Sequence, residues 1–203
     1  MPELRKEGKS LQQANKAAIL IHGRGASSSS ILGLKEYLNL DEFALIAPQA
    51  EANTWYPYSF MAPDKSNEVA LKSSLEQINN AFSEIVKTGI APQNIFLIGF
   101  SQGACLSLEF AALHAQKLGG VIAFTGGLIG QDLQPEKYSG DFEGTQIFIG
   151  SSKRDFHVPM NRIMESAKLL QSMGANVKTL LFEDSSHTIR KEEIDWVNQH
   201  ILS

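Results

Sequence analysis

The chain has 203 residues and a mass of 22.3 kDa, which is the size of one domain, so we expect a single domain over residues 1–203. Hydrophobic residues make up 43% and charged residues 20%, a composition that excludes a disordered chain. The formal charge of 18 − 22 = −4 comes without any block of Lys or Arg, so no nucleic-acid partner is indicated.

The N-terminal region contains no targeting or membrane signal. Residues 1–16 are polar without an apolar core, which is unlike a signal peptide. The first apolar run, residues 17–21, is too short to cross a bilayer. The only cysteine, Cys105, cannot form an internal disulfide or a cysteine-only metal cluster. These features predict a cytoplasmic protein without membrane insertion.

Strand and helix patterns alternate along the chain. Short apolar runs rich in Ile, Val and Phe predict buried strands at residues 17–21, 43–47, 95–98, 121–124, 146–149 and 177–182. Apolar spacings of three and four predict helices at residues 67–87, 102–116, 159–173 and 191–201, and the serines at 27–30 predict a further helix start. Such alternation with short connections predicts a mainly parallel central sheet with helices on both faces.

One segment, residues 48–64, breaks this alternation. It has no clear period and carries three prolines and four aromatic residues, Trp55, Tyr56, Tyr58 and Phe60. A long loop in a compact domain is usually functional. The rings either plug the edge of the core or wall a pocket, and we expect Trp55, Tyr56 and Phe60 to flank the substrate.

The strongest chemical signal is the sequence Gly99-Phe-Ser101-Gln-Gly103. It is a G-x-S-x-G motif directly after a predicted strand and directly before a predicted helix, the setting of a nucleophile elbow. The serine must sit on a tight, strained turn, and glycines two residues to either side remove the side chains that would collide there. The helix that follows directs its first amides at the reaction centre.

A nucleophilic serine needs a base, and the base needs an orienting acid. The histidines are His22, His114, His157, His187 and His200. For this fold the chain order is serine, then acid, then histidine, with acid and base in loops after later strands. His187 alone meets that order with a predicted strand before it and a predicted helix after it, so we predict it as the base.

The acid is expected between Ser101 and His187, just past a strand. Asp155 follows the predicted strand at 146–149 and is the first candidate. Asp184, three residues before His187, is the second candidate, although it could instead brace the same loop. Asp132 and Asp141 lack a clean strand before them, and a surface position is the simplest account of both.

An oxyanion hole needs two backbone amides. The amide of Gln102, directly after the nucleophile, supplies one. The loop His22-Gly23-Arg24-Gly25 follows the first apolar strand, and its glycines let the backbone approach a substrate closely, so the amide of Arg24 is the second candidate. The Arg24 side chain either contacts an acidic substrate or is simply solvated, and both interpretations stay open.

Together these residues resemble the phospholipase/carboxylesterase family of α/β-hydrolases, which is related to acyl-protein thioesterases. The motifs that carry the resemblance run over nearly the whole chain: His22-Gly23-x-Gly25, Pro48-Gln49, Trp55-Tyr56, Gly99-Phe-Ser-Gln-Gly103, Asp155-x-His157-Val-Pro159 and His187. The resemblance implies the α/β-hydrolase fold, a triad of Ser101, Asp155 and His187, and an oxyanion hole from the amides of Arg24 and Gln102. Many relatives carry Leu-Gly-Asp where this chain has Arg24-Gly25-Ala26, which favours the small bacterial esterase branch over the protein-depalmitoylating branch.

We therefore expect a serine hydrolase that cleaves small-molecule carboxylic esters with small to medium acyl groups through an acyl-enzyme. No metal or organic cofactor is expected, because the chain has no H-E-x-x-H motif and no phosphate-cradling glycine loop. The resemblance further implies a monomer or a homodimer. Two alternatives remain: a thioesterase acting on acyl-proteins or small acyl thioesters, and a non-catalytic ligand-sensing α/β-hydrolase, whose hallmark would be loss of a triad member.

Overall fold

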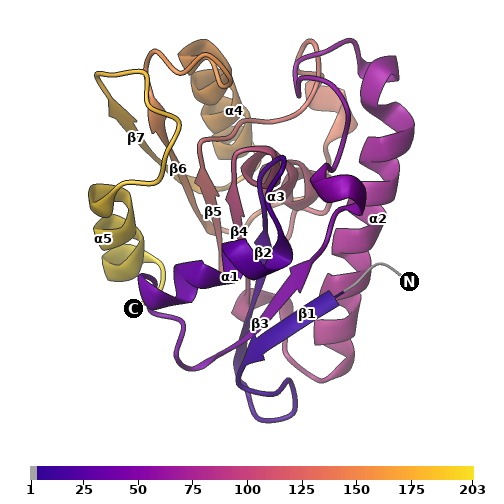
Figure 1. The fold of residues 1–203 in the computed structure, drawn as a ribbon, viewed down its shortest axis with the longest axis vertical. Helices are drawn as coiled ribbons and strands as arrows, with labels where there is room; N and C mark the ends of the chain where they lie inside the picture. The colour runs from indigo at the N-terminus through magenta and orange to yellow at the C-terminus, as the bar shows by residue number, and fades with distance from the viewer. Residues whose placement is uncertain (1–3) are drawn as a thin grey trace.

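The computed structural model describes residues 4–203, which form one seven-stranded sheet with the strand order β1-β3-β2-β4-β5-β6-β7 (Figure 1). The strands are β1 (Leu4–Gly8), β2 (Lys16–Ile21), β3 (Phe43–Pro48), β4 (Ile95–Phe100), β5 (Gly120–Phe124), β6 (Gln146–Ser152) and β7 (Asn176–Phe182). All neighbouring pairs are parallel except β1 and β3, which pair antiparallel at one edge.

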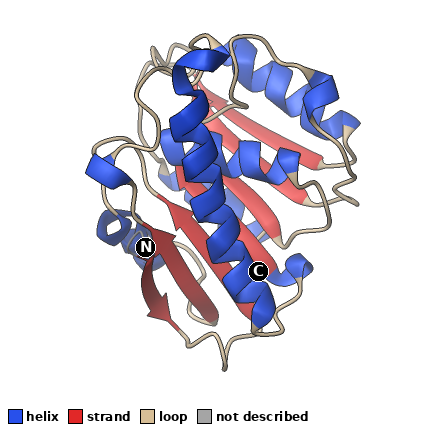
Figure 2. Ribbon diagram, turned by 90° about the vertical axis from the view of Figure 1, so that its right-hand side faces the viewer, coloured by secondary structure: helices blue, strands red, loops and turns tan. Residues whose placement is uncertain are grey.

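Helices cover both faces of the sheet. The α-helices are α1 (Ser28–Leu32), α2 (Asp64–Lys87), α3 (Gln102–Leu113), α4 (Met160–Ser172) and α5 (Lys191–His200). Short 3₁₀ turns occupy Gly33–Glu36, Glu51–Asn53, Pro92–Asn94 and Pro135–Lys137. Helices α2, α3 and α4 pack on one face of the sheet, and α1 and α5 pack on the other. Each face has its own apolar cluster. Figure 2 shows the long α2 lying across the sheet. Successive strand residues therefore enter opposite clusters, as Ile19 and Leu20 do, which explains the unbroken apolar runs.

Six strands were predicted from the sequence, and all six are present. The prediction missed β1, whose sequence Leu-Arg-Lys-Glu-Gly is mostly exposed because the strand lies at an edge. The serine tract does begin a helix: the Ser27 side chain accepts a hydrogen bond from the Ser30 amide and caps α1. The helix expected over 102–116 ends at Leu113, so its last three residues were predicted wrongly.

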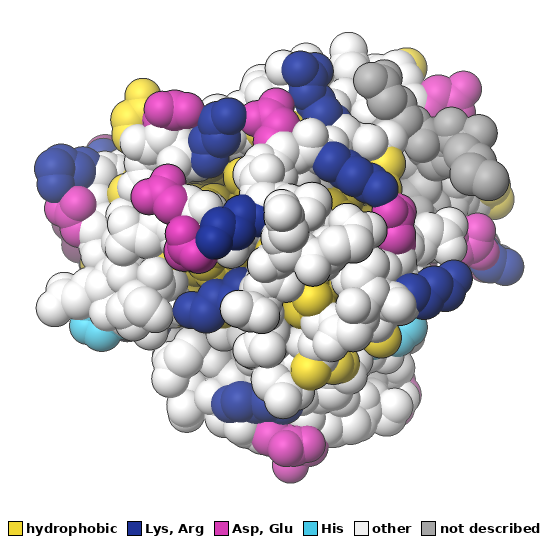
Figure 3. All heavy atoms as spheres, turned by 90° about the horizontal axis from the view of Figure 1, so that it is seen from below, with side chains coloured by type: hydrophobic (Ala, Val, Ile, Leu, Met, Phe, Trp, Pro, Cys, Tyr) yellow, Lys and Arg dark blue, Asp and Glu magenta, His cyan; other side chains and the backbone are white. Residues whose placement is uncertain are grey.

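Charges of both signs are mixed on one face of the molecule. Figure 3 shows the view from below, where lysine and arginine side chains are interspersed with acidic ones. Within residues 4–203, none of the helices combines the length and apolarity needed to span a membrane.

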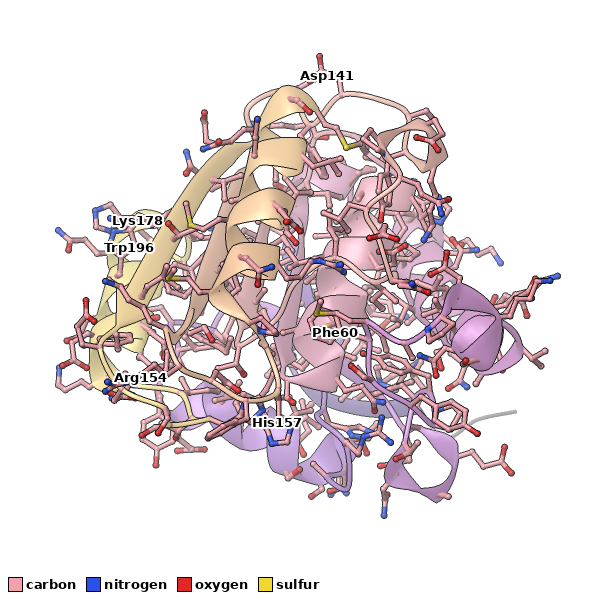
Figure 4. All side chains as sticks on the ribbon, turned by 90° about the horizontal axis from the view of Figure 1, so that it is seen from above. Phe60, Asp141, Arg154, His157, Lys178 and Trp196 are labelled. Atoms are coloured by element: carbon pink, nitrogen blue, oxygen red, sulfur yellow. The ribbon has the colours of Figure 1, made fainter. Side chains whose placement is uncertain are left out.

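The parallel strands direct the loops at their carboxyl ends to one end of the molecule. In Figure 4 the labelled Asp141, before β6, and His157, after it, lie at opposite ends of the view. The predicted site residues all follow carboxyl ends of strands: Arg24 after β2, the aromatic loop after β3, Ser101 after β4, Asp155 after β6 and His187 after β7. In open α/β sheets this end holds the ligand.

Candidate active site

Ser101 occupies a strained turn between β4 and α3. Its backbone has φ 55° and ψ −117°, in the positive-φ range that few side chains adopt. The turn is held because the Ser101 amide donates to the Phe124 carbonyl at 2.9 Å while the Ser101 carbonyl accepts from the Cys105 amide at 3.0 Å. The two flanking glycines leave no room for a side chain. A Cβ on Gly99 would lie 2.2 Å from the Gly103 carbonyl oxygen, and a Cβ on Gly103 would lie 2.0 Å from the Ile21 carbonyl oxygen.

The structure brings Ser101, His187 and Asp155 together from three different loops. His187 Nε2 lies 2.8 Å from Ser101 Oγ, and His187 Nδ1 lies 2.7 Å from Asp155 Oδ2. A carboxylate accepts hydrogen bonds, so Nδ1 carries the imidazole proton and Nε2 is free to accept from the serine hydroxyl. This is the geometry required of a nucleophile, a base and an orienting acid.

Asp155 and Asp184, the two candidate acids, lie in different surroundings. The side chain of Asp155 is fully buried, and its second oxygen, Oδ1, accepts from the His157 amide at 2.7 Å. Asp184 instead pairs with Arg190 at 2.6 Å and accepts from the Ser152 hydroxyl at 2.8 Å. The hydrogen bond from the Ser186 amide holds the pKa of Asp184 below its usual value. Asp184 thus braces the His187 loop, and Asp155 alone of the two contacts the imidazole.

His22 has a structural position that the sequence did not reveal. It is fully buried; Nδ1 lies 2.7 Å from the Gly23 carbonyl, and Nε2 accepts from the Ala50 amide at 3.2 Å. Burial lowers the pKa of His22, so the ring stays neutral. The single ring lone pair, on Nε2, therefore accepts from the loop after β3 and links that loop to the loop after β2, which carries His22.

The two predicted oxyanion amides lie in the loop after β2 and at the first turn of α3. The amides of Arg24 and Gln102 donate to no acceptor within residues 4–203. Gln102 is the first residue of α3, so its N–H points out of the helix N-terminus, where the helix dipole favours negative charge.

A cavity of about 570 Å³ opens onto Ser101 and His187. Its other lining residues are Arg24, Tyr56, Pro57, Tyr58, Ser59, Phe60, Gln102, Cys105, Phe156, His157 and Val158. Two of the three predicted pocket aromatics, Tyr56 and Phe60, are in this lining although both are buried in the core. Trp55 lies behind it, where its ring packs 4.9 Å from His22 and its indole N–H donates to the His22 carbonyl at 2.8 Å.

Polar side chains from several elements fix the aromatic loop. The Arg24 guanidinium donates to the carbonyls of residues 56, 57 and 58 at 2.8–2.9 Å. The side chain of Gln102 accepts from the Trp55 amide at 3.0 Å and donates to the Tyr56 carbonyl at 2.8 Å. Ser74 and Asn67 of α2 bind further backbone groups of this loop. Sequence reasoning missed these roles because the partners are backbone groups, most of them distant along the chain.

The one cysteine of the pocket lining is chemically quiet. Burial raises the pKa of Cys105, one helical turn after Ser101, to about 12, so its thiol stays protonated. Residues 4–203 contain no cluster of three or more His, Cys, Asp or Glu side chains arranged to hold a metal ion.

Comparison with known proteins agrees with the sequence motifs. The family model described as Phospholipase/Carboxylesterase matches residues 8–203. Acyl-protein thioesterase 1 of Kluyveromyces lactis is 32% identical, with 79% of this chain and 78% of that protein covered. A probable carboxylesterase of Oryza sativa subsp. japonica is 26% identical, with 92% of this chain and 79% of that protein covered.

Solved structures show the same architecture. The crystal structure of a phospholipase/carboxylesterase from Dyadobacter fermentans is 45% identical, covers 100% of this chain and 97% of its own, and superposes with a TM-score of 0.98. The Bacillus cereus carboxylesterase, at 19% identity and a TM-score of 0.78 over 98% of this chain and 92% of its own, shares the fold. The predicted fold and family are confirmed: the chain belongs to the phospholipase/carboxylesterase family of serine hydrolases, with the α/β-hydrolase fold.

Proposed function

We propose that this enzyme hydrolyses carboxylic esters with small to medium acyl groups, with Ser101, His187 and Asp155 as its catalytic triad. The observation that carries the proposal is the continuous hydrogen-bonded chain from Ser101 Oγ through the imidazole to the buried Asp155, at the wall of a cavity of about 570 Å³. That chain supports general-base activation of a serine alcohol.

The reaction would proceed in two steps. Ser101 Oγ attacks the ester carbonyl while His187 Nε2 takes the hydroxyl proton, and Asp155 stabilises the resulting imidazolium. The tetrahedral intermediate collapses when His187 gives that proton to the leaving alcohol oxygen, and Ser101 is left acylated. Water, deprotonated by His187, then attacks the acyl-enzyme, and the proton passes back to Ser101 Oγ as the carboxylic acid leaves.

The oxyanion of each intermediate would be bound by the amides of Arg24 and Gln102. Both are without an acceptor within the described chain, and both follow strands whose carboxyl ends meet at Ser101. Each such donor contributes about 3 kcal/mol of transition-state stabilisation.

A thioesterase is the second candidate, because the same triad cleaves thioesters and the Kluyveromyces lactis relative is named an acyl-protein thioesterase. The sequence Arg24-Gly25-Ala26, where many relatives carry Leu-Gly-Asp, supports small to medium acyl groups over long ones. The single-domain organisation, the cytoplasmic location and the monomeric or dimeric state stay predictions.

The test is hydrolysis of p-nitrophenyl esters of increasing acyl length, each beside its thioester analogue, by the wild type and by Ser101→Ala. Ser172→Ala, an exposed serine in α4, is the matched control. We expect turnover and fluorophosphonate labelling in the wild type and the control and neither in Ser101→Ala. A folded protein that shows no turnover on any substrate and no labelling would overturn the hydrolase proposal and favour a ligand sensor.

A further inference from the structure

The catalytic pocket is lined by cationic and neutral groups. Its titratable side chains include Arg24 and the imidazoles of His157 and His187, and no Asp or Glu is in the lining. The neighbouring carboxylate of Asp155 is fully buried and bound to His187. Glu109, the other nearby acid, is also buried and pairs with Lys137 and the Tyr138 hydroxyl. Neither carboxylate is available to neutralise Arg24.

The Arg24 guanidinium is fixed in place but not neutralised. Its three acceptors are backbone carbonyls of the aromatic loop, at 2.8–2.9 Å, and it forms no ion pair with a carboxylate within residues 4–203. Three of its five N–H groups are used, which leaves Nε–H and one Nη1–H. Carbonyl acceptors orient a guanidinium without cancelling its charge.

The charge acts on the interior of the pocket. Burial raises the pKa of Tyr56, whose ring lines the same cavity, and the charge of Arg24 opposes that rise. Arg24 is an exposed residue of the pocket lining, and its hydrogen bonds to three neutral carbonyls leave its charge unpaired. The choice of arginine, held rigidly beside a pocket without acids, therefore points to a negatively charged partner that arrives with the ligand.

We propose that the substrates are esters that carry an anionic group, such as a carboxylate, on their acyl or alcohol part, and that Arg24 binds this group. The inference rests on the proposed function and names the substrate class of the same pocket. Nε–H and one Nη1–H remain as donors. They point to different sides of the guanidinium, so the anion would bind one of them together with the unpaired charge. The fixed orientation lowers the entropy lost on forming that contact.

The test compares anionic esters with neutral esters of the same shape. For the acyl part, p-nitrophenyl hydrogen adipate is compared with p-nitrophenyl 6-oxoheptanoate. For the alcohol part, 4-acetoxybenzoate is compared with 4-acetoxybenzamide. We expect kcat/KM to favour the anionic member of at least one pair about tenfold or more at low salt, and to lose part of that ratio at high salt. The pair that shows the ratio identifies which part of the substrate carries the anion.

Three variants separate charge recognition from loop support. Arg24→Gln removes the charge and is expected to reduce the ratio to about one, whatever it does to the neutral ester. Arg24→Lys restores the charge and is expected to restore part of the ratio. Asn67→Ala removes hydrogen bonds to the same loop at residues 58 and 59 and leaves Arg24 intact, so the ratio should persist.

The outcomes are distinguishable from failure of the proposed function. A ratio near one for both pairs in the wild type, or a ratio that survives Arg24→Gln, overturns this inference while the neutral esters are still hydrolysed. Absence of turnover on every member of both pairs overturns the proposed function itself.

Discussion

At the scale of single residues, the site depends on positions where one more atom would not fit. Gly103 faces the backbone of β2, and Gly99 faces the backbone of Gly103. These contacts place α3 directly against the strands, so the first amide of the helix reaches the loop that follows β2. The same tightness forces Ser101 into its positive-φ conformation.

Gly103→Ala is expected to destabilise the protein by about 3 kcal/mol or more, because its Cβ would lie 2.0 Å from a backbone oxygen that cannot rotate away. Urea unfolding measures the free energy. Gly33→Ala is the matched control, since Gly33 has φ −58° and no neighbour within 4 Å, and it should leave stability unchanged or slightly higher. Equal stability of the two variants would contradict the packing argument.

The two candidate acids give a second prediction. Asp155→Asn removes the acceptor for His187 Nδ1–H and should lower kcat by on the order of 10³–10⁴ with the protein still folded. Asp184→Asn weakens the pairing with Arg190 and should lower thermal stability while most turnover remains. Steady-state kinetics on a neutral ester, paired with thermal melts, checks both. The reverse ranking of the two kcat values would assign the acid to Asp184.

The chain order of Ser101, Asp155 and His187 could be predicted because an elbow motif and strand ends are local patterns. The partners of the Arg24 and Gln102 side chains could not, because their acceptors lie 32 to 47 residues away and are backbone groups that any residue provides. The candidate triad could thus be proposed from motif order and the family resemblance, with Asp184 left as a second candidate acid, whereas the support of the pocket wall required the three-dimensional structure.

At the scale of elements, α4 and the loop after β5 are joined through one buried arginine. Arg162 is 3% exposed and donates to the carbonyls of Leu128 at 3.2 Å, Gly130 at 2.6 Å and Gln131 at 2.8 Å. The Gly130 amide in turn donates to the Phe60 carbonyl at 2.9 Å. Arg162 therefore fixes the loop after β5, and that loop in turn binds the backbone of Phe60 in the pocket wall.

Arg162→Met is expected to cost about 3 kcal/mol of unfolding free energy, because it leaves buried carbonyls without donors. Lys168→Met, on the exposed side of the same helix, should change stability by less than about 0.5 kcal/mol. Urea titrations of the two variants compare them directly. If Arg162→Met unfolds at the same urea concentration as Lys168→Met, the three hydrogen bonds do not contribute to stability.

The elements themselves were predictable where both faces are buried. Strands β2 to β6 each contain an unbroken run of at least four apolar or glycine residues, which is a signal that a sequence pattern detects. Strand β1 carries three charged residues out of five and is held by its pairing with β3, so its formation depends on a neighbour that is distant in sequence. The residues of β1 alone therefore do not predict a strand.

At the scale of the whole molecule, stability should depend on pH through Glu193 at the start of α5. Its side chain is fully buried; one carboxyl oxygen accepts from the Arg190 amide at 2.7 Å, and the other has no partner within the described residues. Burial raises the pKa of Glu193 from 4.5 to about 7. The folded protein thus keeps a proton that the unfolded chain releases.

Proton linkage predicts that the free energy of unfolding falls as pH rises. Below about pH 4.5 Glu193 is protonated in both the folded and the unfolded state. As pH rises from there through about 7, the unfolded chain releases this proton first, and the protein loses at most about 3 kcal/mol of unfolding free energy. Relative to wild type, Glu193→Gln should therefore gain stability between pH 5 and pH 8.5 in urea unfolding. The exposed neighbour variant Glu192→Gln should show a much flatter difference. A Glu193→Gln difference that is constant with pH would refute the assignment.

The hydrogen bonds that tie the aromatic loop to Arg24, Gln102, Ser74 and Asn67 have a consequence for ligand binding. The conformational entropy of that segment is lost once, when the chain folds, and not again each time a substrate arrives. We expect the binding-competent pocket to be fully populated in the free protein, so the apparent affinity for a substrate should equal its intrinsic affinity. Differences in KM between substrates should then reflect the contacts that each one makes with a wall already in place.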